Sequence, residues 1–192
     1  MNDYLSKGAD LSRCGKYRYR LWREWRLHPE PAQWEMWTDE SRKPLLDGAG
    51  QQLGEPKACV FIMLNPSTAG GEEDDPTIRR CVGFARAWGY DRLEVLNLFA
   101  YRATDPKALL SLNHDDDPVG ESNLSAFNRV LGLPVGIVIC AWGAHGGHLG
   151  QDETAIGWLG SHRRFALGLT KGGHPKHPLY LPGRAEPVRF RP

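Results

Sequence analysis

The sequence lacks the features that mark several large classes of protein. No apolar run approaches the roughly 18 residues of a membrane-spanning helix, so no membrane association is expected. The first residues have neither the basic end nor the apolar stretch of a secretory signal. Four cysteines are widely scattered, and three lie in apolar surroundings. This pattern predicts buried thiols rather than a disulfide framework, and with it a cytoplasmic location.

Charge and short motifs exclude further classes. The net charge of +1 gives no general attraction to nucleic acid. There is no Gly-x-Ser-x-Gly elbow, no phosphate-binding loop and no dinucleotide-binding fingerprint. A local basic surface is still possible, because four arginines cluster near the start of the chain: Arg18, Arg20, Arg23 and Arg26. Residues 16–25 alternate polar and aromatic side chains, which predicts either an edge strand with protective charges or a strand that contacts a nucleic-acid backbone.

What the sequence does contain predicts one folded domain. The chain has 192 residues and 41% hydrophobic residues, enough to form a full core. We expect a flexible tail over residues 1–15 and a single α/β domain over residues 16–192, present as a monomer. Residues 27–57 are rich in Pro and Gly and predict a loop-rich insertion, in which residues 34–37 and 45–46 could form a small hairpin.

Strand and helix patterns alternate along the rest of the chain. Apolar runs predict strands at residues 58–64, 92–101, 133–144 and 165–169. Helices are predicted at residues 76–88, 107–112, 117–132 and 152–159, the first beginning at Asp75-Pro76 and ending at Gly89. This order predicts an α/β/α sandwich of three layers, whose central sheet has four mainly parallel strands plus an N-terminal edge strand or hairpin.

Polar residues follow the ends of these strands. Asn65 ends the first, Asn97 lies in the second, a Gly-rich turn at residues 143–148 follows the third, and a loop with His174 follows the fourth. Because parallel strands end at one edge of a sheet, we expect these groups to surround one site.

The sequence also offers two candidate metal sites. His145, His148, His174 and His177 form two His-x-x-His pairs at neighbouring strand ends, a spacing that could hold zinc in a metal-dependent hydrolase. The acidic run at residues 72–75 could bind a divalent cation, although its position before a helix also fits a favourable interaction with the helix dipole.

Five segments carry a resemblance to a known family. The chain is identified as a member of domain of unknown function family 1643 on residues 61–69, 75–80, 97–104, 141–145 and 173–180. That family name implies no activity.

The order of three short motifs resembles a second, broader group, the uracil-DNA glycosylase superfamily. Residues 63–67 match its Gly-x-Asn-Pro-Gly strand end, residues 96–98 its base-recognising Asn, and residues 174–178 its His-Pro-Ser-Pro loop. The resemblance implies that fold and the hydrolysis of an N-glycosidic bond. It implies that Asn65 orients a water, that His174 donates a hydrogen bond to the departing base, and that Asn97 reads the pyrimidine edge.

The resemblance also implies contacts with the ligand, a nucleobase, nucleoside or nucleic acid, and no cofactor. Besides Asn97, the expected contacts are Leu64, Pro66, Ser67, Thr68, Ile78, Trp142, Gly143, His145 and His177. Ile78 stands near the place of a stacking aromatic, and Ser67 where the uracil-selective branch has a bulky Tyr. The missing aromatic and the near-neutral charge favour an alternative, a non-catalytic module that binds a nucleotide or nucleic acid.

Overall fold

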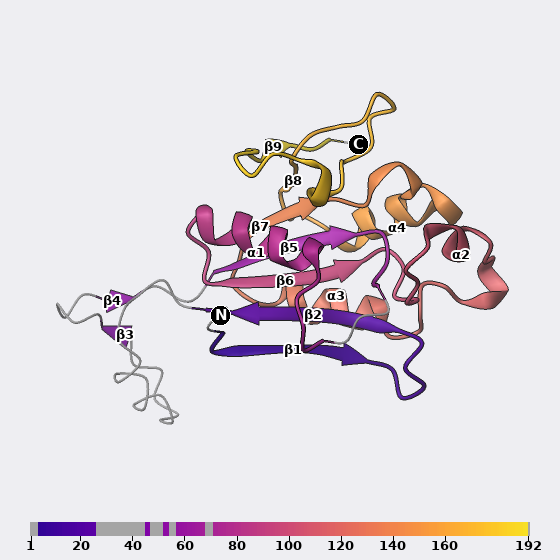
Figure 1. The fold of residues 1–192 in the computed structure, drawn as a ribbon, viewed down its shortest axis with the longest axis horizontal. Coiled ribbons are helices and arrows are strands. Elements are labelled where there is room, and N and C mark those ends of the chain that lie inside the picture. Colours follow the sequence, from indigo (N-terminus) through magenta and orange to yellow (C-terminus); the bar gives the residue numbers. More distant parts are fainter. Residues whose placement is uncertain (1–3, 26–44, 47–51, 54–56, 68–70, 192) are drawn as a thin grey trace.

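The computed structural model describes residues 4–25, 45–46, 52–53, 57–67 and 71–191. Its centre is a seven-stranded mixed sheet in the order β1-β2-β6-β5-β7-β8-β9 (Figure 1). The strands are β1 Ser6–Leu11, β2 Arg18–Glu24, β5 Ala58–Met63, β6 Arg92–Asn97, β7 Val135–Cys140, β8 Arg164–Ala166 and β9 Val188–Arg189. Strand β5 pairs in parallel with β6 and β7, and β7 with β8, whereas β1, β2 and β9 join antiparallel. The sheet is therefore mixed, and it is wider than the predicted four central strands plus an N-terminal edge strand or hairpin.

The N-terminal segment is part of this sheet. The expected tail at residues 1–15 is wrong for Ser6–Leu11, which pairs with β2 as strand β1. Strand β2 is consequently not at the edge of the sheet, and Arg20 and Arg23 on it form hydrogen bonds within the protein. Arg20 binds the fully buried Glu94 of β6 through two hydrogen bonds of 2.8 Å. The N-terminal basic cluster is thus largely engaged in internal ion pairs, although Arg26 lies outside the described residues.

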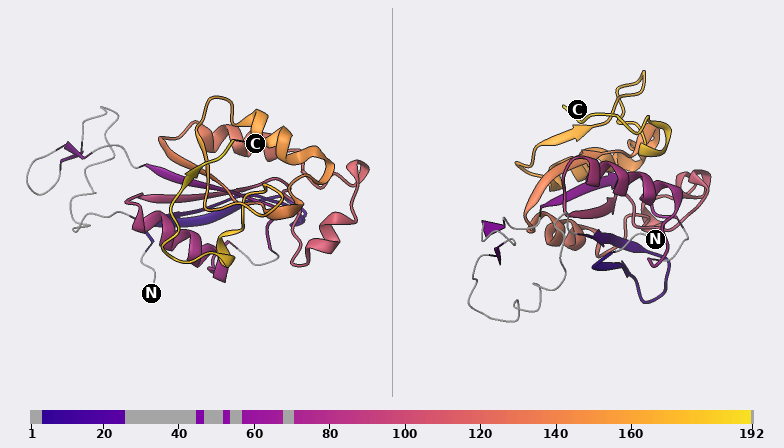
Figure 2. Two further views of the ribbon diagram at one scale, coloured as in Figure 1. Left: turned by 90° about the horizontal axis from the view of Figure 1, so that it is seen from above. Right: turned by 60° about the vertical axis from the view of Figure 1, so that its left-hand side comes forward.

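Helices cover both faces of the sheet. They are α1 Pro76–Ala87, α2 Pro106–Leu110, α3 Asn123–Leu131 and α4 Gln151–Trp158. Helix α1 packs Ile78, Val82 and Phe84 into one hydrophobic cluster, whereas α3 and α4 contribute Phe127 and Ala155 to the other. Figure 2 shows α1 and the α3–α4 pair on opposite sides of the sheet. The strands between them are buried on both faces, as an apolar run such as that of β5 requires.

Local sequence signals set the bounds of α1 as predicted. The Asp75 carboxylate accepts a hydrogen bond from the Ile78 backbone N–H, and Pro76 occupies the first turn. Gly89 follows the helix with a φ of +76°, a conformation that glycine adopts without strain. The first turn of this helix lies at the carboxyl edge of the parallel strands.

The insertion at residues 27–57 lies mostly outside the described residues, including the segment 34–37 expected in a hairpin. Within it, β3 Leu45–Leu46 pairs antiparallel with β4 Gln52–Leu53. None of the helices in the described part of the chain combines the length and apolar character that crossing a membrane requires.

Candidate functional site

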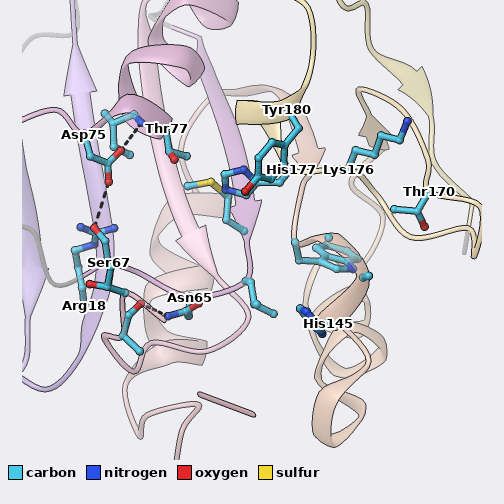
Figure 3. Close-up of a pocket in the computed structure, with 18 residues that line it drawn as sticks. Arg18, Asn65, Ser67, Asp75, Thr77, His145, Thr170, Lys176, His177 and Tyr180 are labelled. Carbon is cyan, nitrogen blue, oxygen red and sulfur yellow. Dashed lines mark hydrogen bonds between the residues drawn. The ribbon is translucent and has the colours of Figure 1, made fainter. Parts of the chain in front are cut away.

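A cavity of about 580 Å³ opens at the carboxyl edge of the parallel strands. The loops after β5, β6, β7 and β8 line it, together with the first turn of α1 and the first residue of β2 (Figure 3). The lining residues are Arg18, Met63, Leu64, Asn65, Ser67, Asp75, Thr77, Ile78, Ala103, Thr104, Trp142, Gly143, Ala144, His145, Thr170, Lys176, His177 and Tyr180. Its volume falls in the range of about 300–1,000 Å³ typical of small-molecule sites.

Asn65 enters this cavity with a fixed orientation. Its Nδ2 donates to the backbone carbonyls of Ala103, at 2.8 Å, and of Pro66, at 3.2 Å. Pro66 itself is buried, and its carbonyl also accepts from the Ala103 N–H at 3.0 Å, which ties the ends of β5 and β6 together. Because both amide hydrogens of Asn65 are engaged, its Oδ1 is the atom available to accept a hydrogen bond from a ligand or water.

His177 also lines the cavity, and its contacts define which nitrogen can donate. Its Nδ1 accepts the Leu179 backbone N–H at 3.3 Å, so the proton of the neutral ring belongs on Nε2. Burial lowers the pKa of His177 from its ordinary value of 6.5, and the nearby Asp75 carboxylate opposes that shift. A neutral imidazole with an Nε2–H donor is therefore the form expected near neutral pH.

One end of the cavity is polar and buried. Arg18 is 3% exposed, and burial lowers its pKa to about 10. Asp75 lies close by and favours the charged form of Arg18. Its second carboxylate oxygen accepts the Ser67 hydroxyl at 3.2 Å, and Figure 3 shows Arg18, Ser67 and Asp75 grouped together. This end presents both donors and acceptors.

The other end of the cavity is open to solvent. Lys176 and His145 are exposed, and Thr170 is half-buried on the same loop as Lys176. Figure 3 shows Asn65 and His177 between this group and the Arg18–Asp75 end.

Asn97 does not reach the cavity. It is 1% exposed, lies on β6 directly beside Met63 of β5, and is absent from the lining, whereas Met63 is part of it. Neither side-chain polar atom of Asn97 has a hydrogen-bond partner among the described residues. Asn97 lies within the paired part of β6, because the pairing with β5 continues beyond it: the Leu98 N–H donates to the Met63 carbonyl.

His174 is also outside the lining, because its loop closes on itself. The Thr170 N–H donates to the His174 carbonyl at 2.8 Å, and the His174 N–H donates to the Thr170 hydroxyl at 3.1 Å. The residues that flank this turn, Leu169 and Pro175, pair as an isolated antiparallel β-bridge. After this turn the chain lines the cavity again at Lys176, His177 and Tyr180. The expected meeting of Asn65, Asn97 and His174 around one cavity is not found; of these three side chains, only that of Asn65 lines it.

The remaining expected contacts divide clearly. Those that line the cavity are Leu64, Ser67, Ile78, Trp142, Gly143, His145 and His177. The expected contact by Pro66 is wrong, because Pro66 is buried and not part of the lining, and Thr68 lies outside the described residues. The four histidines do not form a ligand set: the His148 ring contacts the Leu112 carbonyl at 3.1 Å. In the described part of the chain, no group of three or more His, Cys, Asp or Glu side chains could hold a metal ion. This finding contradicts the zinc alternative and offers no support for a cation site in the acidic run.

Several lining residues were not recognised from the sequence. The sequence pattern places Arg18 on an edge strand and Asp75 in an acidic run that begins a helix or binds a cation, and neither pattern predicts a pocket. Lys176 lies between two His-Pro pairs, and its sequence context predicts no role in a pocket. The one available signal was position, since Asp75 and Lys176 each lie in a loop that follows a predicted strand.

The fold and the cavity define an α/β protein with a small-molecule-sized pocket at the carboxyl edge of its sheet. A family model described as "Protein of unknown function (DUF1643)" matches residues 47–179, more than half of the chain. The chain belongs to this family. Neither the curated proteins nor the solved structures gave a match.

Proposed function

We propose that the chain hydrolyses the N-glycosidic bond of a nucleobase bound in this pocket, with a fold of the uracil-DNA glycosylase type. The observation that carries the proposal is the pairing of two oriented groups in one cavity. Asn65 offers an acceptor, Oδ1, and His177 offers a donor, Nε2–H.

Each group fits one side of the reaction. Asn65 Oδ1 would hold a water against C1′ of the sugar, and the water oxygen would form the new C1′–O bond. The C1′–N bond would break with its electron pair moving to the base nitrogen. His177 Nε2–H would stabilise the negative charge that develops on the base, and the second hydrogen of the water would end on the base nitrogen. This assigns to His177 the role that the superfamily resemblance gave to His174.

The test is release of free base, followed by chromatography, from a panel of nucleosides and short oligonucleotides with normal and modified bases. Asn65→Ala should abolish release. His177→Ala should lower the rate about 10²–10³-fold, the usual cost of losing one oriented donor in a transition state. His174→Ala is the matched comparison, because the geometry expects full activity from it. Loss of activity with His174→Ala and not with His177→Ala would refute the assignment, and no release by the folded wild-type chain would refute the function.

A second function, binding without cleavage, is favoured by two findings. The Asn97 amide, which would read the base in the superfamily, is buried outside the lining. Ile78, near the place of a stacking aromatic, does line it. Under this alternative, a ligand at 100 times its dissociation constant would stabilise the fold by about 2.7 kcal/mol, with no free base formed.

A further inference from the structure

The open end of the pocket carries positive charge that is not neutralised within the described chain. Lys176 is exposed, lines the pocket and forms no ion pair with any carboxylate of the described residues. His145 lines the same end. Thr170 adds a hydroxyl whose oxygen already accepts the His174 N–H, so its hydrogen can be donated to a ligand.

The acidic run beside the pocket would repel an anion less than its sequence suggests. The oxygens of Asp75 accept hydrogen bonds from a backbone N–H and from a hydroxyl. Asp74 pairs with Arg23 at 2.7 Å, and Glu72 with Lys7 at 3.4 Å. Among the described lining residues Asp75 is the single carboxylate, and it lies at the end away from Lys176 (Figure 3).

We propose that the ligand is a nucleoside monophosphate, with its phosphate bound by Lys176, His145 and Thr170. This inference rests on the proposed function, which places the glycosidic bond at Asn65 and His177. With the bond there, we place the base at the Arg18–Asp75 end and the sugar phosphate at the open end, because Asn65 and His177 lie between these two ends in Figure 3. A phosphate monoester carries a charge of about −1.5 to −2 and three acceptor oxygens, which suits a lysine, an imidazole and a hydroxyl that line the same end of the pocket. The cavity of about 580 Å³ suits one small molecule.

Isothermal titration tests the proposal with ribo- and deoxyribonucleosides, their 5′-monophosphates, inorganic phosphate and single-stranded trinucleotides. The proteins are the wild type, Lys176→Ala and Lys171→Ala. Lys171 is the matched control, since it is an exposed lysine of the same loop that does not line the pocket. At least one monophosphate should bind about tenfold more tightly than its nucleoside, as expected for a charge-assisted phosphate contact. Lys176→Ala should remove this preference, so that the monophosphate and its nucleoside bind about equally, and Lys171→Ala should keep it.

Several results would overturn the phosphate site. These are equal affinity for nucleoside and monophosphate, equal losses in the two lysine variants, or no binding by any member of the panel. Tighter binding of a trinucleotide than of every monophosphate would show that the ligand is a nucleic acid and not a free nucleotide. Base release is measured in the same samples with Asn65→Ala as reference. A phosphate preference without release would leave this inference standing and refute hydrolysis, whereas release without a phosphate preference would do the reverse.

Discussion

Replacing Gly146 by alanine should distort the wall of the pocket through Trp142. A Cβ at residue 146 would lie 2.0 Å from Cδ1 and 2.4 Å from Nε1 of the Trp142 indole, far inside contact distance. The backbone at Gly146 is right-handed helical, with φ −58° and ψ −35°, so alanine itself causes no backbone strain there. Trp142 is 3% exposed and packs edge-on against Phe190 at a centroid distance of 5.9 Å, which leaves little room to move.

The expected cost is that of overpacking a core, about 1–3 kcal/mol. Gly147→Ala is the matched control, because its backbone is also right-handed and its nearest neighbour would be an Asp152 oxygen at 3.9 Å. Both changes reduce the freedom of the unfolded chain by a similar amount, so their difference isolates the clash. For a chain of this size, the difference corresponds to a melting temperature roughly 2–12 °C lower for Gly146→Ala.

Urea unfolding, followed by circular dichroism, measures the two variants. Near-ultraviolet dichroism reports the environment of the tryptophans and should change for Gly146→Ala alone. Equal unfolding free energies within about 0.5 kcal/mol, with unchanged aromatic spectra, would show that the indole of Trp142 does not occupy this position.

Two further predictions concern the groups around the pocket. Arg23→Met should cost about 3–5 kcal/mol in urea unfolding, because Arg23 is fully buried and its loss leaves Asp74 without that partner; a cost below about 1 kcal/mol would contradict the ion pair. His177→Asn tests the lowered pKa of His177, which disfavours the charged ring in the fold. As the pH falls below 6.5, the unfolded chain takes up the proton first, so His177 makes the wild type less stable at pH 5 than at pH 7. The variant keeps a side-chain acceptor for the Leu179 N–H and should lose that part of the difference; an identical pH dependence of unfolding would contradict the shift.

Local signals predicted those elements whose reason for forming is local. Helix α1 follows from the Asp75 cap, the apolar spacing of its buried face and the turn at Gly89, all within 15 residues of sequence. Strand β5 follows from its continuous apolar run. Strand β1 could not be predicted in this way, because its Ser-Lys-Gly-Ala-Asp-Leu sequence has no apolar alternation and its pairing with β2 supplies the reason for an extended conformation.

The choice between two histidines depended on how one loop closes. The sequence offers His174-Pro175 and His177-Pro178, which are equivalent as motifs. In the fold, hydrogen bonds between Thr170 and His174 form a small turn, and the residues after it return to the pocket. Spacing along the chain contains no information about that turn. The position of Asn97 was ambiguous for a related reason, since a shift of a single residue along a strand decides whether a side chain lies inside the sheet layer or beyond its end.

The pocket depends on a part of the chain that the family model does not cover. That model matches residues 47–179, whereas Arg18 lines the pocket from β2. The same hairpin fixes the acidic loop, because Arg23 donates to Asp74 at 2.7 Å and to the Gly71 carbonyl at 2.7 Å. Asp75, the next residue, both begins α1 and faces Arg18. A fragment limited to the matched residues would therefore lose a lining cation and the contacts that hold the Asp75 end of the pocket in place, so ligand binding by this chain should require the β1–β2 hairpin.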